Sequence, residues 1–168
     1  MMQIFHGSDR PIEHPEIRDT NRYLDFGIGF YTTSNESQAL RWAARVRMRN
    51  SSESEVLSVY NFDMERAIKK LKIKTFPKAD REWLDFVLAN RSGKIWPETY
   101  DLVIGPVADN SVYATFKLFE TGLLDIEETV HRLKTEKLCD QILFHTGKAL
   151  EFCSFIESRI QKGQHHAV

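Results

Sequence analysis

Cysteine is scarce in this sequence, and neither Cys139 nor Cys153 has a second cysteine or a histidine at metal-ligand spacing. Two isolated thiols are typical of a reducing compartment and argue against a disulfide framework. No apolar run is long enough to span a bilayer. The first residues, MMQIFHGS, lack the basic start and apolar core of a signal peptide. The sequence therefore predicts a cytoplasmic protein with no membrane segment and no metal site.

The sequence also has no excess of charge of either sign. Lys and Arg number 23 against 24 Asp and Glu, which gives a net charge of -1 and no global attraction to nucleic acid, although a local basic patch stays open. No Gly-Lys-Ser/Thr follows the glycines near Gly27, so there is no P-loop, and no serine-hydrolase elbow is present. With 168 residues and 42% hydrophobic content, the chain is expected to form one domain over residues 1–168 with a substantial core.

The order of the expected elements predicts the fold class. Residue type and periodicity place strands near both ends of the chain and helices between them. The expected strands are Gln3–His6, Phe26–Thr33, Val56–Phe62, Tyr100–Ile104 and Gln141–Phe144, with a brief extended piece at Lys72–Phe76. The expected helices are Glu36–Arg49, Met64–Leu71, Asp80–Asn90, a segment capped by Asp109 or Ser111 that runs to Phe119, Ile126–Leu133 and Gly147–Gln161. This mixed order predicts an α+β fold rather than a regular β-α-β series.

One stretch, DFGIGFYTTSNESQALRW from Asp25 to Trp42, combines a glycine turn, two aromatic residues and a helix start. Glycine lets a backbone approach a ligand closely, and an aromatic ring after such a turn can face a flat ligand. The N-terminal FHGS repeats this combination. We expect these two stretches to meet, and the segment from Asp140 to Thr146 to close a site with them. The polar segment from Asp9 to Arg22 reads as a long loop that could fold over a ligand.

Each candidate residue in these stretches also has a purely structural interpretation. His6 can donate from its ring to a ligand hydroxyl, or it is a core or turn histidine. Tyr31 can stack on a cationic ring for roughly 0.5–2 kcal/mol, or it packs on the core. For Trp42 the residue type favours the core. Gln141 is either a solvated strand start or a residue that holds a sugar hydroxyl in a cleft.

Two charged groups elsewhere have similar alternatives. Asp101 and Asp109 flank a GPVA turn and could act as paired carboxylates, although a capping role explains Asp109 better. The basic run Arg41, Arg45, Arg47 and Arg49 is either a solvated helix face or a phosphate-binding surface.

The motifs FHGS, FGIGFYTT and DQILFHT, taken in this order, resemble the three-part signature of ADP-ribosyltransferases of the diphtheria-toxin and poly(ADP-ribose) polymerase type. The chain resembles more closely an uncharacterised bacterial domain family with HGS, DFGxGFYxT, an A-x-x-W-A-like helix, DxxxGPVAD and QxxFxT. That resemblance covers nearly the whole chain. The resemblance to the ADP-ribosyltransferase superfamily implies an α+β fold with a split mixed β-sheet, a central helical insertion and NAD bound as the substrate in the cleft.

The resemblance also implies roles for individual residues. His6, Tyr31 and Gln141 would form the catalytic triad, with His6 on the adenosine-side ribose and Tyr31 stacked on the nicotinamide. The backbone of Gly7 would pair with the nicotinamide carboxamide. Trp42 falls where the polymerases keep a second stacking tyrosine. The same motifs add three further residues to the expected NAD-binding set, namely Ser8, Gly29 and Phe30.

Two departures from the polymerase pattern bear on activity. Ala39 replaces a serine that bonds the carboxamide, and Gln141 replaces the catalytic glutamate. A neutral glutamine can orient the ribose but gives less electrostatic help. This favours single-unit transfer to a protein or nucleic-acid acceptor, as in a bacterial toxin held by a neighbouring antitoxin. The alternatives are an inactive module that binds NAD or ADP-ribose, and a nucleic-acid-end 2′-phosphotransferase for which only Arg41, Arg45 and Arg91 offer phosphate contacts.

Overall fold

Seven strands form two sheets in the computed structural model, which describes residues 1–18, 24–94, 96–107, 110–134 and 138–162. The first sheet has three strands in the order β1-β3-β7, and the second has four in the order β2-β6-β5-β4. In the first sheet the strands are β1 (Met2–Ser8), β3 (Ser54–Phe62) and β7 (Cys153–Lys162). In the second they are β2 (Phe30–Thr32), β6 (Asp140–Phe144), β5 (Leu102–Pro106) and β4 (Ile73–Thr75). The predicted α+β class is confirmed.

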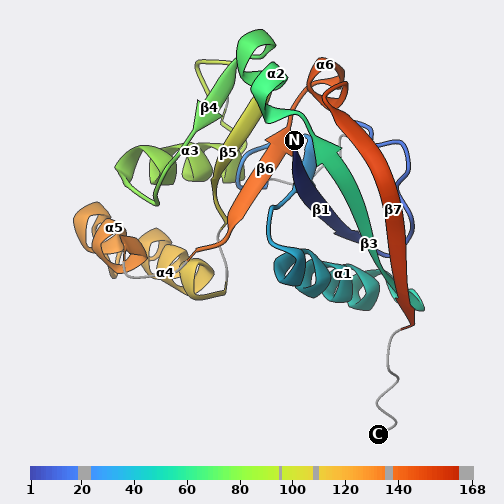
Figure 1. The fold of residues 1–168 in the computed structure, drawn as a ribbon. Coiled ribbons are helices and arrows are strands. Elements are labelled where there is room, and N and C mark those ends of the chain that lie inside the picture. Colours follow the sequence, from blue (N-terminus) through green and yellow to red (C-terminus); the bar gives the residue numbers. More distant parts are fainter. Residues whose placement is uncertain (19–23, 95, 108–109, 135–137, 163–168) are drawn as a thin grey trace, which may run out of the picture.

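Six helices accompany these sheets in the described part of the chain: α1 (Glu36–Asn50), α2 (Met64–Lys70), α3 (Arg81–Arg91), α4 (Asn110–Glu120), α5 (Ile126–Lys134) and α6 (Gly147–Leu150). Figure 1 shows the sheets side by side, with α1 packed against the first and α3, α4 and α5 grouped beside the second. None of the described helices is long and apolar enough to cross a membrane.

The two sheets touch at one backbone bridge between Phe5 and Thr33. Phe5 N donates to Thr33 O at 2.8 Å, and Thr33 N donates to Phe5 O at 3.0 Å. Beyond this bridge β1 pairs with β3 while β2 pairs with β6, so the strands part at His6 and Tyr31. The FHGS and FYTT segments therefore lie on either side of an opening between the two sheets.

Helix α1 forms where the sequence predicts a helix, and it packs on the first sheet. The side chain of Asn35 accepts the Gln38 N–H at 2.9 Å, and the buried face is Ala39, Ala43 and Val46. Gly7 permits this contact, because a Cβ at that position would lie 2.0 Å from Ala39 O. The side-chain side of Gly7 is therefore filled by a helix rather than left open for a ligand.

A second core lies between α3 and the four-stranded sheet. The Asp80 side chain accepts the Trp83 N–H at 3.1 Å, so the expected start of this helix is confirmed. Trp83, Leu84 and Val87 are fully buried, as the amphipathic pattern predicts, and they pack in one cluster with residues of β5, β6, α4 and α5.

The predicted closing helix over Gly147–Gln161 is wrong. Helix α6 ends at Leu150, and Cys153–Lys162 forms β7 instead. Strand β7 pairs antiparallel with β3 along most of its length. These long-range backbone bonds decide the conformation, and local periodicity does not reveal them.

Other strand boundaries also differ from the predicted ones. The strand expected over Phe26–Thr33 is limited to β2, because Gly27 has a φ of 89° and the chain turns there. The expected first strand extends through Ser8. The cap proposed for Asp109 lies outside the described residues, as do residues 163–168 and part of the loop from Asp9 to Arg22.

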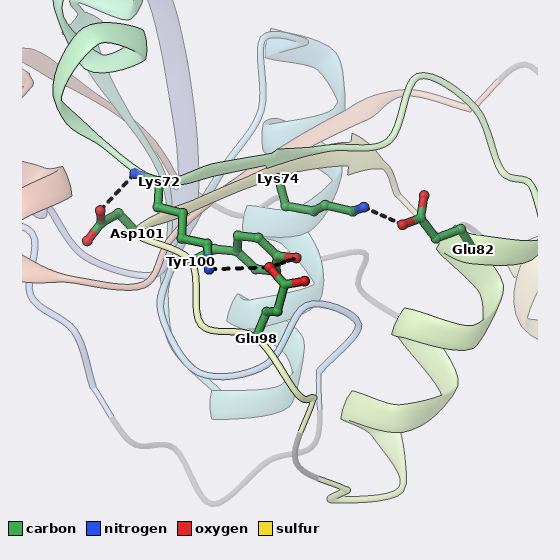
Figure 2. Close-up of polar contacts among 6 residues, drawn as sticks. All are labelled: Lys72, Lys74, Glu82, Glu98, Tyr100 and Asp101. Atoms are coloured by element: carbon green, nitrogen blue, oxygen red, sulfur yellow. Dashed lines mark hydrogen bonds and ion pairs between the residues drawn. The ribbon is translucent and has the colours of Figure 1, made fainter.

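Asp101 belongs to a structural network at one end of the second sheet, where β4 and β5 begin (Figure 2). Its carboxylate accepts Lys72 N at 2.9 Å and Thr146 Oγ1 at 3.0 Å. Partial burial acts to raise the pKa of Asp101, but these hydrogen bonds outweigh it and the net pKa is lowered. The acid-base role considered for Asp101 has no support here, because the carboxylate is charged and held by neighbouring backbone and side chains.

Candidate functional site

A cavity of about 510 Å³ opens where β1 and β2 part. This volume is within the roughly 300–1,000 Å³ of small-molecule sites. Residues of β1, β2, α1, β6 and the loop after β1 line it, so the structure brings the three expected stretches together. The predicted catalytic residues His6, Tyr31 and Gln141 all line this cavity, as do Gly7, Ser8, Gly29, Phe30 and Trp42.

His6 lies at the point of divergence. Its Nδ1 is 2.7 Å from Tyr31 O, and its ring stacks on Phe30 with centroids 4.5 Å apart. A carbonyl oxygen only accepts, so Nδ1 carries the proton in this contact. Burial lowers the pKa of His6, although the bond to Tyr31 opposes the shift, so the ring is neutral near pH 7. Its Nε2 is then an acceptor, whereas the sequence suggested that the ring donates to a ligand hydroxyl.

Tyr31 is fixed across the glycine turn. Its hydroxyl donates to Gly27 O at 2.7 Å and accepts Phe26 N–H at 3.1 Å. The half-buried ring packs against the second core on one side and also borders the cavity. The stacking and core interpretations of Tyr31 are therefore compatible, because the core holds the ring whose remaining surface lines the cavity.

His145, which sequence reasoning missed, contacts the same glycine turn. It hydrogen-bonds to the backbone of Ile28, and burial lowers its pKa despite the opposing effects of that bond and of the Asp101 charge. A Cβ on Gly27 would lie 3.7 Å from the His145 ring. The position of His145 directly after the apolar strand was the available sequence signal, and its role is to shape the turn.

Gln141 is buried, with 5% of its surface exposed, and it faces the cavity from β6. Its Nε2 lies 3.5 Å from Pro106 O, a long hydrogen bond. With the amide nitrogen turned to Pro106, the amide oxygen is the group that remains to accept from a ligand. Gln141 is therefore not a solvated strand start.

Asp140 and Gln38 fix the start of β6 against α1. The Asp140 carboxylate accepts Thr33 Oγ1 at 3.0 Å, Ser34 N at 3.1 Å and Ser34 Oγ at 2.9 Å. Gln38 Nε2 donates to Asp140 O at 3.2 Å, while Gln38 Oε1 is buried without a hydrogen-bond partner. The Asn35 N–H donates to Thr33 Oγ1 at 3.0 Å and not to the Gln38 side chain. These contacts position Gln141.

The backbone of Gly7 faces the opening. Both backbone groups of Phe5 bond to Thr33, and backbone groups alternate sides along a strand. The N–H and C=O of Gly7 therefore lie on the same edge of β1 as those of Phe5, on the side where β2 diverges. Gly29 is also tightly packed, since a Cβ there would lie 2.3 Å from Phe144 O.

The remaining predicted binding residues differ in exposure. Ser8 is buried and its hydroxyl donates to Arg10 O at 2.6 Å. Phe30 is buried beneath His6. Trp42 is 40% exposed at the cavity wall, so the core placement that its residue type favoured is wrong.

Three arginines of α1 lie on the cavity wall. Arg41, Arg45 and Arg49 follow one another at four-residue spacing on α1 and line the cavity. Arg47 turns away and pairs with Glu55 at 2.9 Å. Arg91 lies 3.8 Å from the buried carboxylate of Asp25, which also lines the cavity and was not among the predicted residues.

The loop after β1 is ordered over its described part. Ile12 N donates to Ser58 Oγ at 3.1 Å, and the Tyr60 hydroxyl donates to Ile12 O. The loop thus covers one face of the first sheet and contributes Ile12, His14 and Glu16 to the cavity wall. Among the described residues no group of three or more His, Cys, Asp or Glu gathers to hold a metal ion.

These observations define an α+β protein with a cavity between two diverging sheets. A family model described as "Protein of unknown function (DUF3990)" matches residues 2–155, and the chain belongs to that family. No curated protein matches the chain.

Proposed function

We propose that the protein is an NAD-dependent mono-ADP-ribosyltransferase whose core is the split mixed sheet with a central helical insertion. One observation carries this proposal: His6, Tyr31 and Gln141, from three segments far apart in the sequence, line one cavity at the divergence of the sheets. Their order is that of the three-part transferase signature, with Gln141 in the place of its glutamate. NAD would bind as the substrate, and a protein or nucleic acid would receive the ADP-ribose.

The chain's own groups have definite tasks in this proposal. Neutral His6 accepts from a ribose hydroxyl through Nε2, and the edge of Gly7 pairs with the carboxamide. Tyr31, held by Gly27 and Phe26, presents its ring to the nicotinamide. Gln141 accepts from the ribose next to the reacting carbon through its amide oxygen.

The transfer itself is a substitution at the ribose. The bond between nicotinamide and ribose breaks, nicotinamide leaves with the electron pair, and an acceptor nucleophile forms the new bond and loses its proton. Fixed groups around the ribose lower the cost of orientation. The neutral Gln141 offers little compensation for positive charge on the ribose, which favours slow transfer of single units.

A catalytically inactive module that binds NAD or ADP-ribose is the second candidate. The observation that favours it is the absence of charge on Gln141, whose amide nitrogen is turned to Pro106. Such a module would regulate a partner through ligand binding, and an antitoxin-like protein would be one partner for either function.

Adenine-labelled NAD distinguishes the two candidates. The purified protein is incubated with labelled NAD and a bacterial lysate, protein and nucleic acid are separated, and nicotinamide release is followed in parallel. Label on a macromolecule that is lost in His6→Ala supports the transferase. NAD binding without label or nicotinamide release supports the binding module, and no binding contradicts both.

A further inference from the structure

One face of α1 forms a basic wall of the cavity. Arg41, Trp42, Arg45 and Arg49 line the cavity, and all four are exposed. With 3.6 residues per turn, their side chains lie within about 100° of arc around the helix. We name these four residues the basic face of α1. It adjoins the buried face that packs on β1, so it borders the cavity from the side of the first sheet.

The cavity wall carries more positive than negative charge. Among the described residues that line it are five arginines and three acidic residues, in a chain whose net charge is -1. Glu16, one of the three, is paired with Arg18 of its own loop at 3.2 Å. The wall is therefore the local basic patch that the balanced overall charge leaves open, and it favours an anionic ligand.

The basic face starts beside Gln141 and leads away from it. At the beginning of α1, Gln38 Nε2 donates to Asp140 O at 3.2 Å, and Asp140 directly precedes Gln141. A helix rises 1.5 Å per residue, so Arg49 lies about 16 Å farther along α1 than Gln38. The two phosphorus atoms of the NAD pyrophosphate share one oxygen, so that group occupies only part of this length. The whole length fits an anion with several phosphates in sequence.

The loop after β1 continues the row of arginines at the far end of α1. The Asp9 carboxylate accepts Asn50 Nδ2 at 2.8 Å and Ser52 Oγ at 3.0 Å. This link holds the next residue, Arg10, near the end of the helix, and Arg10 also lines the cavity. Arginine side chains therefore follow one another along this wall up to the end of α1.

Trp42 adds an aromatic surface to the row. Its side chain is 40% exposed, and it shares the helix face with Arg45, three residues later. Sites for single-stranded nucleic acids combine a basic groove with aromatic rings on which bases stack. In a duplex each base is covered by its neighbours, and a cavity of about 510 Å³ admits a nucleotide but not a duplex. The combination favours a single strand over a duplex, and over an acidic protein segment that has no base to stack.

We propose that the acceptor of the transferase is a single-stranded nucleic acid that binds along the basic face of α1. Its phosphates would contact the three arginines, one base would stack on Trp42, and the reacting nucleotide would enter the cavity toward Gln141. Nicotinamide leaves the ribose with the electron pair of the broken bond, and an oxygen or nitrogen of that nucleotide forms the new bond and loses its proton to solvent. This inference rests on the proposed function and specifies its acceptor.

Fluorescence anisotropy tests the binding step without NAD. The probes are labelled single strands of RNA and of DNA with about twelve nucleotides of mixed sequence, a length within the range of known single-strand sites. The comparison ligands are the matching duplex and a polyglutamate peptide of the same charge. At least one single strand should bind saturably and more weakly as salt is added, with the duplex and the peptide roughly tenfold weaker. No binding of either strand, or equal binding of the duplex or the peptide, overturns the proposal.

Neutral variants locate the strand. Arg45→Gln with Arg49→Gln should weaken binding roughly tenfold or more, and the slope of log affinity against log salt should fall by roughly 1.4, which is about 0.7 for each lost phosphate contact. The matched control is Lys69→Gln with Lys70→Gln, which removes the same charge from exposed positions of α2 away from the cavity. The control should bind as the parent does, and circular dichroism verifies that both variants are folded. Equal weakening in the two variants contradicts the proposal, because binding would then follow net charge alone.

Trp42→Phe tests the stacking contact. An unlabelled strand should quench part of the tryptophan fluorescence of the parent, and this quenching should be absent in Trp42→Phe. Trp83 is fully buried, so it does not contact the strand. Quenching that persists in the variant would place the strand elsewhere and contradict the proposal.

A transfer assay separates a failure of this inference from a failure of the proposed function. The protein is incubated with adenine-labelled NAD and either the strand or a bacterial lysate. Label on the strand, reduced in Arg45→Gln with Arg49→Gln, supports the proposed acceptor. Label on lysate protein and none on nucleic acid overturns the inference but leaves the transferase standing. Absence of NAD binding overturns the proposed function, and the acceptor role with it.

Discussion

The imidazole Nδ1 of His6 lies 2.7 Å from the carbonyl oxygen of Tyr31, across the point where the two sheets part. This contact joins the first and second motif segments directly. It also sets the tautomer of His6, because the proton on Nδ1 is committed to a carbonyl. One hydrogen bond thus decides both the local structure and the chemistry that His6 can offer to a ligand.

One amide substitution, His6→Asn, separates these two tasks of His6. The Nδ2 group of asparagine occupies the place of imidazole Nδ1, so His6→Asn should keep the bond to Tyr31 while removing the acceptor at Nε2. We expect NAD affinity to fall roughly tenfold, the equivalent of one lost hydrogen bond of about 1.4 kcal/mol. Isothermal titration calorimetry measures the affinity, and thermal unfolding should show little change.

His6→Ala provides the comparison for that variant. It removes both contacts, so the protein should lose stability as well as NAD affinity. If His6→Asn binds NAD as tightly as the parent, Nε2 has no part in ligand binding and His6 is a purely structural residue.

Stability should fall as the pH drops below about 6.5. Burial lowers the pKa of His6 and of His145 from the ordinary value of 6.5. The unfolded chain therefore binds protons in a range where the folded chain does not, and stability rises with pH across it. The contribution is complete above pH 6.5 and is lost from there down to the lowered pKa values. Urea unfolding at pH 7.5 and 5.5 measures the difference.

His145→Gln tests the assignment of this pH effect. A glutamine can still donate to the backbone of Ile28 but does not titrate. The variant should lose less stability than the parent between pH 7.5 and 5.5. An identical loss in both proteins would assign the effect to other groups.

The fold was predictable where local signals act alone. Helices α1 and α3 begin within one residue of their predicted starts, after the caps Asn35 and Asp80, and their buried faces follow the helical period. Strand β7 was not predictable from local signals, because its conformation depends on pairing with β3, which is distant in the sequence. The cavity followed from motif order, but the contacts of Asp140 and Gln38 join side chains to backbone positions that no local pattern specifies. Residue type alone placed Trp42 wrongly in the core, because it gives an average burial and does not say which face of a helix is packed.

Gly7 should tolerate no side chain, because α1 lies against it. An alanine Cβ would meet Ala39 O at 2.0 Å and Ala43 N at 2.8 Å, both backbone atoms that cannot rotate away. Gly7→Ala should therefore destabilise the protein by about 1–3 kcal/mol or more, which thermal or urea unfolding can measure. The matched control is Gly147→Ala, because a Cβ there meets nothing within 4 Å. The control should be neutral or slightly stabilising. Equal stability of the two variants would mean that α1 packs less closely on β1 than described.

Gln141→Glu should raise the rate of transfer. The position is buried beside the site proposed for the ribose, and the amide differs from a carboxylate chiefly in charge. A carboxylate there would compensate positive charge on the ribose as the nicotinamide bond breaks. A single preorganised electrostatic group contributes about 10²-fold or more to the rate of other enzymes, so we expect nicotinamide release to increase by roughly that order while NAD affinity changes little.

Gln141→Glu should also destabilise the fold, and this loss of stability must be measured separately from the change in transfer rate. Pro106 O, which accepts from Gln141 Nε2 at 3.5 Å, would face a carboxylate oxygen instead, and the buried charge would destabilise the fold. Gln141→Met, of similar volume and without charge or amide, controls for loss of the hydrogen bond. A faster Gln141→Glu beside an inactive Gln141→Met would show that the site is built for transfer and limited by charge. Two equally inactive variants, both folded and still binding NAD, would instead favour the binding module.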